Sequence, residues 1–206
     1  MFYAAYLTKK IEFISSIFPW LILLYRIYYE RIVEDEILLG DISDKDSVLF
    51  IGGGPFPCTA IEIARKTSAK VYVVDNDPIA VKMAMKLIKK MNLDKQVFIR
   101  CIQGQEIDAS EYSVIHIAQQ AYPKEVILEN ILCKMKIGTR ILLRSRKNGL
   151  DSFYNRHNAL CECIECKTIR QGKSSDKITF LITKLGRGKE YEFRVKKDSI
   201  IDNRNS

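Results

Sequence analysis

Runs of β-branched and aromatic residues recur along the middle of the chain, separated by stretches whose apolar residues lie three or four positions apart. The first kind of run is typical of buried strands and the second of amphipathic helices. The predicted strands are residues 48–51, 70–75, 96–103, 112–120 and 139–145. Because parallel strands are joined by helical crossovers, this alternating order predicts an α/β fold with a doubly wound, Rossmann-like parallel sheet.

Three of the connecting helices have recognisable starts. Thr59 followed by Glu62 has the spacing of a capping box, and Asp77 followed by Pro78 has the form of an N-cap with proline at the first helical position. A third helix is expected to open at Pro123. The apolar stripe of the second helix is predicted to be Ile79, Met83, Leu87 and Met91.

The pattern changes after the fifth strand. Residues 148–166 predict a turn and a helix, and residues 167–184 predict two strands around a turn at Gly172 to Asp176. We therefore expect one α/β domain over residues 41–186, closed by an antiparallel β-hairpin. Residues 187–206 form a basic tail with a possible short strand at Tyr191 to Val195.

Residues 1–40 form a separate, apolar and helical extension. The longest run without charge, from Phe13 to Tyr25, has 13 residues, whereas a bilayer span needs about 20. Lys9 and Lys10 follow an already apolar start and no small-residue cleavage site closes the run, so a signal peptide is not indicated either. Three interpretations remain, in falling order: a helix packed on the domain, a dimer contact or lid, and a helix lying on a membrane surface.

Composition and charge exclude several classes of protein. The apolar fraction of 47% and charged fraction of 28% are those of a globular protein. The net charge of +8 comes from scattered residues without a basic, aromatic-interleaved motif, so nucleic acid is not an expected partner. Six cysteines without a secretory signal favour the reducing cytoplasm. Cys161, Cys163 and Cys166 with His157 could hold zinc or an iron–sulfur cluster, but one such group is a weak signal, and we expect no metal.

The glycine-rich stretch SVLFIGGGPFPCTAIE, residues 47–62, is the strongest functional signal. A strand that ends in three glycines before a helix is how α/β proteins approach a nucleotide-like ligand. A dinucleotide site needs a third glycine where this chain has Pro57, and no phosphate-loop motif occurs. A nucleoside cofactor without phosphates therefore fits best.

Polar residues at the ends of the other strands support this prediction. Asp75 ends the second strand 23 residues after Gly52, where an acid is placed to bind ribose hydroxyls. Gln103, Gly104 and Gln105 end the third strand, where the adenine edge of a nucleoside would lie. His116 alternates within an apolar strand and is expected to be a core residue rather than a catalyst.

An α/β order closed by an antiparallel hairpin is the ending of class I S-adenosylmethionine-dependent methyltransferases. Within that superfamily, IGGGPFPCTAI resembles the loop of the nicotianamine synthase-like branch, and the similarity continues through VVDNDPIAVKMA and LLRSRKNGLDSFYN. It covers roughly Tyr28 to Tyr154. The resemblance implies S-adenosylmethionine as cofactor and a small molecule as acceptor.

The resemblance also implies roles for individual residues. Gly52, Gly54 and Pro55 would shape the methionine end of the cofactor site, and Asp75 would hold the ribose. Glu36, or failing that Glu34, would be the base for an amine acceptor, with Tyr122 as a second catalytic candidate. The remaining cofactor-binding candidates are Gly53, Thr59, Asn76, Gln103, Gly104, Gln105 and Gln119, and the substrate-binding candidates are Arg144, Ser145 and Tyr154.

Two reactions use such a site. The acceptor attacks either the methyl carbon of the sulfonium or the γ-carbon, in which case it receives the aminocarboxypropyl group. Methyl transfer is the more frequent reaction in the superfamily and is the first expectation, with aminocarboxypropyl transfer as the alternative. A non-catalytic binding module that uses its N-terminal helix as a partner surface, or a homodimer, also remains open.

Overall fold

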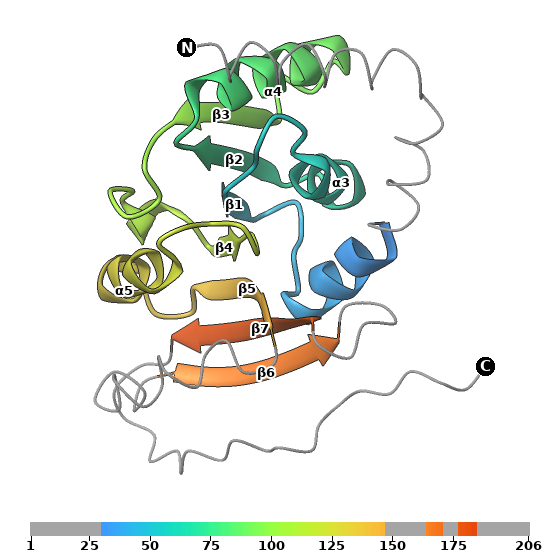
Figure 1. The fold of residues 1–206 in the computed structure, drawn as a ribbon. Helices are drawn as coiled ribbons and strands as arrows, with labels where there is room; N and C mark the ends of the chain where they lie inside the picture. Colours follow the sequence, from blue (N-terminus) through green and yellow to red (C-terminus); the bar gives the residue numbers. More distant parts are fainter. Residues whose placement is uncertain (1–29, 147–163, 171–176, 185–206) are drawn as a thin grey trace, which may run out of the picture.

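The computed structural model describes residues 30–146, 164–170 and 177–184 of the 206. They form a seven-stranded sheet in the order β3-β2-β1-β4-β5-β7-β6 (Figure 1). The five strands from β1 to β5 are parallel, and β7 pairs antiparallel with both β5 and β6. The strands are β1 Ser47–Ile51, β2 Lys70–Asp75, β3 Val97–Cys101, β4 Val114–Ile117, β5 Arg140–Arg146, β6 Ile164–Arg170 and β7 Lys177–Lys184. The predicted doubly wound sheet with a terminal hairpin is confirmed.

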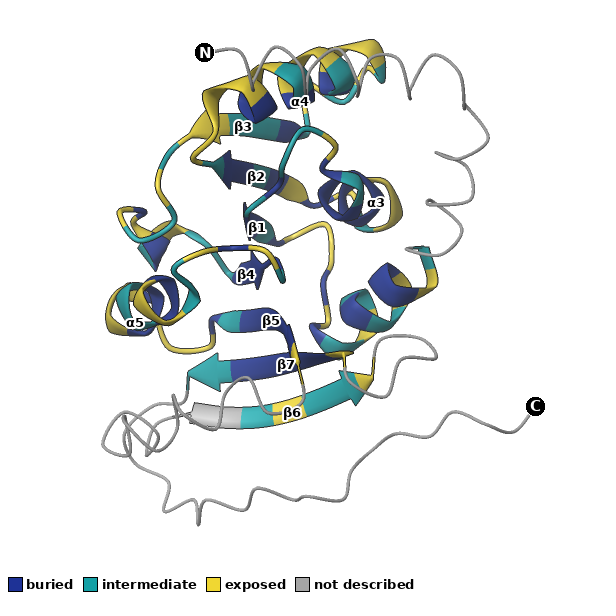
Figure 2. Cartoon of the chain, viewed as in Figure 1, coloured by how far each residue is buried: buried dark blue, intermediate teal, exposed yellow. Residues whose placement is uncertain are grey.

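Helices cover both faces of the sheet, so the molecule has three layers (Figure 1). The helix of residues 30–39, α3 (Cys58–Thr67) and α4 (Pro78–Lys90) lie over one face, and α5 (Lys124–Lys134) lies over the other, near the 3₁₀ turn η1 (Ala109–Glu111). Two clusters of buried apolar side chains fill the spaces between the layers, and the central strands are buried almost throughout (Figure 2). A parallel sheet requires this cover because its strands are apolar on both sides.

The helix starts follow the predicted signals only in part. Asp77 caps α4, since its Oδ1 accepts from the backbone N–H of Ile79 at 2.8 Å. The capping box at Thr59 is wrong, because α3 begins at Cys58 and Pro57 occupies its N-cap without a side-chain acceptor. The Thr59 hydroxyl instead accepts a bond from Arg144, so it belongs to the cleft rather than to the helix end.

The packing face of α4 also differs from the prediction. The buried residues are Ala80, Val81, Ala84 and Ile88, whereas Ile79 is 39% exposed and Met83, Leu87 and Met91 are only partly covered. Small alanines on the buried side let a helix approach a sheet closely. The observed stripe therefore differs in register from the predicted one, although Leu87 and Met91 still pack against the buried cluster.

The terminal hairpin is longer than predicted. Residues 164–166, which were expected to end a helix, belong to β6 and pair with residues 182–184 of β7. Tyr154, the expected C-terminal strand at 191–195 and residues 1–29 lie outside the described residues. The three interpretations of the N-terminal segment and the domain boundary at residue 40 depend on residues 1–29, so they stay predictions. Among the described helices, none is long and apolar enough to cross a bilayer.

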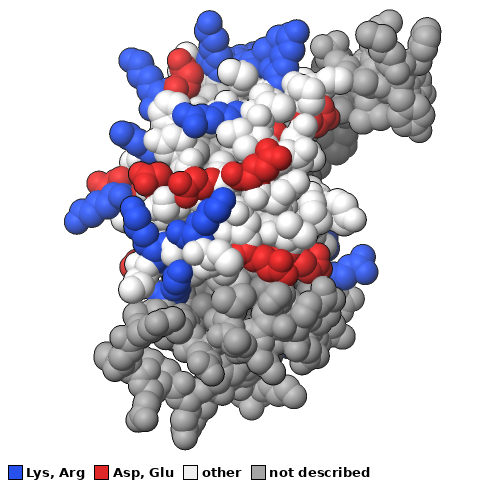
Figure 3. Space-filling model, turned by 90° about the vertical axis from the view of Figure 1, so that its left-hand side faces the viewer, with Lys and Arg blue, Asp and Glu red and all other residues white. Residues whose placement is uncertain are grey.

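Charged side chains of both signs are mixed over the face shown in Figure 3. Lys and Arg side chains gather at the top of this view, at the end of the molecule where α4 lies in Figure 1. Lys66 of α3 makes ion pairs of 2.9 and 2.8 Å with Glu30 and Glu34, which fasten the helix of residues 30–39 to α3. Glu34 therefore lies on the surface, as part of a solvated face.

Candidate active site

The glycine loop turns sharply over the end of β2. The N–H groups of Gly52 and Gly53 both point to the carbonyl oxygen of Val74, at 2.9 and 3.4 Å. A Cβ on Gly53 would meet Cγ1 of Val73 at 2.2 Å, so only glycine permits this approach. Gly52 and Gly54 have φ values of +85° and +61°, which disfavour any other residue. Gly52 and Gly54 are thus required by their backbone conformation, and Gly53 by its close approach to Val73.

Two side chains hold the loop in this shape. Oδ2 of Asp75 accepts from the Gly54 N–H at 2.7 Å, while its Oδ1 accepts from the Asp77 N–H at 3.0 Å. Gln120 donates from Nε2 to the Gly52 carbonyl at 3.0 Å. The loop is therefore fastened from β2 on one side and from the end of β4 on the other.

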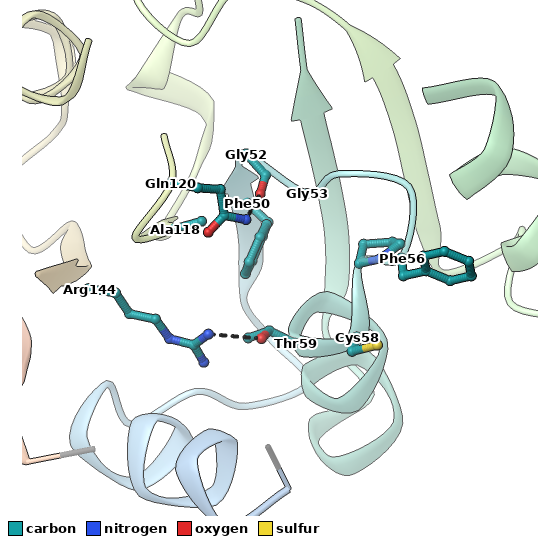
Figure 4. Close-up of a pocket in the computed structure, with 10 residues that line it drawn as sticks. Phe50, Gly52, Gly53, Phe56, Cys58, Thr59, Ala118, Gln120 and Arg144 are labelled. Atoms are coloured by element: carbon teal, nitrogen blue, oxygen red, sulfur yellow. Dashed lines mark hydrogen bonds between the residues drawn. The ribbon is translucent and has the colours of Figure 1, made fainter. Parts of the chain in front are cut away.

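A cavity opens beside the loop, between the carboxyl ends of β1 and β4 (Figure 4). The helices after these two strands go to opposite faces of the sheet, and ligands bind at such switch points in α/β folds. Arg144 reaches across from β5 toward α3, where its Nη1 donates to the Thr59 hydroxyl at 3.2 Å (Figure 4). The cavity is lined by Phe50, Gly52, Gly53, Phe56, Pro57, Cys58, Thr59, Ala118, Gln120 and Arg144.

Behind Arg144 lies a buried polar cluster centred on Glu36. The carboxylate has 0% exposure and accepts four hydrogen bonds from three different elements. Arg144 donates from Nε and Nη2 at 2.7 Å each, Thr179 of β7 donates from Oγ1 at 2.6 Å, and Nε2 of His116 lies 3.1 Å away. Glu36 does not itself line the cavity but lies behind Arg144, which does.

The ionisation of the cluster follows from these contacts. Burial opposes a charged Glu36, but the donors of His116 and Arg144 outweigh it and hold the pKa of the carboxyl well below its usual range. Burial lowers the pKa of His116, and the nearby guanidinium of Arg144 lowers it further, against the opposing effect of the Glu36 carboxylate. The cluster pairs a carboxylate with a guanidinium, and the lowered pKa of His116 favours its neutral form.

This geometry places a condition on the predicted base. All four hydrogen-bonding positions of the Glu36 carboxylate are filled, and a carboxylate with a lowered pKa is a weak proton acceptor. An amine in the cavity can bind Glu36 only if Arg144 first gives up its hydrogen bonds to the carboxylate. The role of Glu36 as a base stays a prediction.

The other predicted residues are distributed around this centre. Tyr122 is 83% exposed and does not line the cavity. Ser145 is buried, and because side chains alternate along a strand it faces the side of the sheet opposite Arg144. Asn76 and Gln103 are exposed beyond β2 and β3, Gly104 and Gln105 are half-buried, and Gln119 accepts a bond from Lys124 through its carbonyl.

Several residues of the site were not predicted. His116 and Thr179 bind Glu36, and Gln120 holds the loop. Lys124, whose pKa burial lowers, donates to the carbonyls of Gln119 and Arg144 at 2.9 and 3.0 Å and so ties the ends of β4 and β5 together. In the sequence these residues look like ordinary core or surface residues. Only His116 stood out, as a polar residue within an apolar strand.

No group of three metal-binding side chains occurs among the described residues. Cys161, Cys163 and His157 lie outside them, so the alternative of a metal at this cysteine group stays open. Cys166 lies in β6.

The Gly53 approach predicts a specific binding defect. Gly53→Ala is expected to weaken binding of a nucleoside ligand such as S-adenosylhomocysteine about tenfold or more, because the new methyl group pushes the loop off Val73. Titration calorimetry measures the change. Gly138→Ala is the control for backbone strain away from the site, since φ +83° strains an alanine there but Gly138 lies outside the cavity. Equal affinity of the two variants would contradict the prediction.

Comparisons with known proteins agree with this architecture. The chain resembles the crystal structure of a glutamate-to-glutamine variant of MtNAS in complex with S-adenosylmethionine, with TM-score 0.70, 24% identity and coverage of 87% of this chain and 72% of that one. The structure of MtNAS in complex with MTA and tNA matches with TM-score 0.69, again at 24% identity, over 87% and 69% of the two chains. At this identity the likeness shows the fold, that of class I methyltransferases and nicotianamine synthases.

The sequence comparison goes further than the fold. The family model "Nicotianamine synthase protein" matches residues 16–173, more than half of the chain, so the protein belongs to the nicotianamine synthase family. The resemblance read from the glycine loop is thereby confirmed. An L-histidine 2-aminobutanoyltransferase of Yersinia pestis is 28% identical over 132 residues, 64% of this chain and 49% of the relative. The chain thus spans about half the length of that curated relative.

Proposed function

We propose that this protein transfers the aminocarboxypropyl group of S-adenosylmethionine to an amine of a small molecule. The observation that carries the proposal is the match to the nicotianamine synthase family over residues 16–173. The name of the Yersinia pestis relative, which describes a 2-aminobutanoyl transfer to L-histidine, points the same way. Methyl transfer, the first expectation from the sequence, is supported only by the fold, so aminocarboxypropyl transfer is the better reading.

The residues of the cleft fit a sulfonium nucleoside. The loop carries Pro57, which has no backbone N–H for a phosphate, and Gly53 lets the loop pack closely on Val73. The side-chain oxygen Oε1 of Gln105 is buried and accepts no hydrogen bond from any described residue. An adenine amino group would supply the missing donor. Asp75 is the candidate for the ribose hydroxyls, and the loop from Gly52 to Pro55 would face the methionine end.

The chemistry is a displacement that needs positioning more than proton transfer. S-adenosylmethionine supplies a γ-carbon that the amine nitrogen attacks, so that an N–C bond forms, the C–S bond breaks and methylthioadenosine leaves. Arg144, at the cavity wall, would hold a carboxylate of the reactants. The incoming amine must lose a proton, which passes to a base or to water.

Product analysis tests this function. Incubation of the protein with S-adenosylmethionine and L-histidine, or another small amine, is expected to release methylthioadenosine, detected by mass spectrometry. Release of S-adenosylhomocysteine would instead establish methyl transfer. Binding of the cofactor without either product, across a panel of amines, would support the non-catalytic alternative.

A further inference from the structure

The buried cluster behind the cavity contains a histidine with no assigned role. We propose that His116 is a positioning residue, a neutral imidazole that fixes two walls of the active site at once. It acts on Arg144 through Glu36 and on Phe50 through ring stacking. The effect on turnover rests on the proposed function, whereas the state of the ring does not.

The first contact is with Glu36. Nε2 of His116 lies 3.1 Å from Oε2 of Glu36, and the same oxygen accepts from Nη2 of Arg144 at 2.7 Å. Because the carboxylate is an acceptor, Nε2 must carry the proton, which fixes the tautomer. His116 thus limits how the carboxylate rotates, and the orientation of the carboxylate decides where the guanidinium points.

The second contact is with Phe50. The two rings are stacked with centroids 4.5 Å apart and an angle of 14° between their planes. The rings belong to neighbouring strands, since residues 50 and 116 are register partners in β1 and β4. Phe50 lines the cavity together with Arg144, whereas His116 does not reach it. His116 therefore contacts Glu36, which supports Arg144, and it also stacks on the ring of Phe50. Arg144 and Phe50 both line the cavity.

The surroundings of Nδ1 explain why the ring stays neutral. Within the described part of the chain, Nδ1 is buried and has no hydrogen-bond partner. Protonation would create a buried N–H without an acceptor beside the guanidinium of Arg144, and both effects are unfavourable. The neutral ring leaves only a lone pair unpaired, so His116 serves as a fixed donor rather than as an acid or base.

A cluster of this kind is a poor choice for stability alone. An ion pair in the core is often no more stable than apolar residues of the same volume, and its retention points to a requirement for geometry. Here the geometry concerns a guanidinium at the cavity wall, held from behind by a carboxylate that itself has two further donors. The cluster is thus arranged to aim Arg144.

Two substitutions separate the donor from the ring. His116→Phe keeps a ring against Phe50 but removes the donor to Glu36, and His116→Gln keeps an N–H in reach of Glu36 but removes the ring. We expect His116→Phe to lower kcat/KM for the acceptor amine about tenfold or more, while S-adenosylhomocysteine affinity stays within about threefold. His116→Gln is expected to retain kcat/KM within about threefold. Equal losses in both variants, or loss of cofactor affinity in step with Tm, would establish a merely structural role.

Nuclear magnetic resonance tests the same inference without turnover. The chain has two histidines, so a His157 variant assigns the ring nitrogens. The spectrum is expected to show His116 as the neutral Nε2–H tautomer, and to remain so as the pH falls below about 6.5, the ordinary histidine value. A doubly protonated ring or the Nδ1–H tautomer at neutral pH would overturn the proposal. Absence of methylthioadenosine with the unmodified protein would refute the proposed function. The NMR spectrum of the His116 ring would still test its tautomer and charge independently of turnover.

Discussion

Glu36→Gln is expected to cause the largest loss of both stability and activity. A glutamine amide offers one oxygen and one NH₂ group to four donors, and it leaves the guanidinium of Arg144 buried without a counter-charge. Breaking a buried pair in this way costs about 3–5 kcal/mol of unfolding free energy. Urea denaturation measures that loss, and the rate of methylthioadenosine release is expected to fall about 100-fold or more.

The pH dependence of this variant separates the two roles of Glu36. If Glu36 orients Arg144, raising the pH does not restore activity, which is the expected result. If Glu36 is the base, activity recovers as the pH approaches the pKa of the acceptor amine, because the amine then loses its proton unaided. Glu34→Gln is the matched control on the same helix, since Glu34 is half-exposed, forms a surface ion pair with Lys66, and its change is expected to have little effect.

Asp75→Asn is expected to have the largest effect on cofactor binding. Both carboxylate oxygens accept backbone N–H groups, from Gly54 and Asp77, so an amide NH₂ must face one of these donors. The loop loses a charge-assisted bond, and the ribose loses its predicted acceptor. We expect the Kd for S-adenosylhomocysteine to rise about 30- to 100-fold, about 2–3 kcal/mol, by titration calorimetry.

The neighbouring acid provides the control for Asp75. Neither acid lines the cavity, but the Asp77 side chain accepts from the N–H of Ile79 at the start of α4, whereas that of Asp75 accepts from Gly54 of the loop. Asp77→Ala is therefore expected to cost about 1 kcal/mol of stability and to leave the Kd within about threefold. Unchanged affinity in Asp75→Asn would show that the acid holds neither the loop nor the ribose.

Much of the fold could be predicted from the sequence, because parallel strands are buried on both faces. Their apolar runs are continuous, as in residues 48–51 and 71–74, and they end at glycine or an acid. Asp75 was found because its place follows from the strand end and the loop, both of which are local features. The family resemblance rested on the same loop.

The buried cluster behind the cavity could not be predicted in the same way. Glu36 meets His116, Arg144 and Thr179 across 80, 108 and 143 residues of chain, and no local pattern records those contacts. A glutamate on a charged helix reads as a solvated residue, and Thr59 reads as a cap. Tertiary contacts override the local preference in both cases.

The contact of Thr179 with Glu36 also bears on when the site can form during synthesis. The strand β7 inserts between β5 and β6, so the penultimate position in the sheet is filled by the last described strand. The helix of residues 30–39 and the glycine loop leave the ribosome early, yet the carboxylate obtains its fourth donor only after 143 further residues have been added. A nascent chain that ends before residue 179 therefore carries the loop for its ligand but lacks a complete anchor for Arg144.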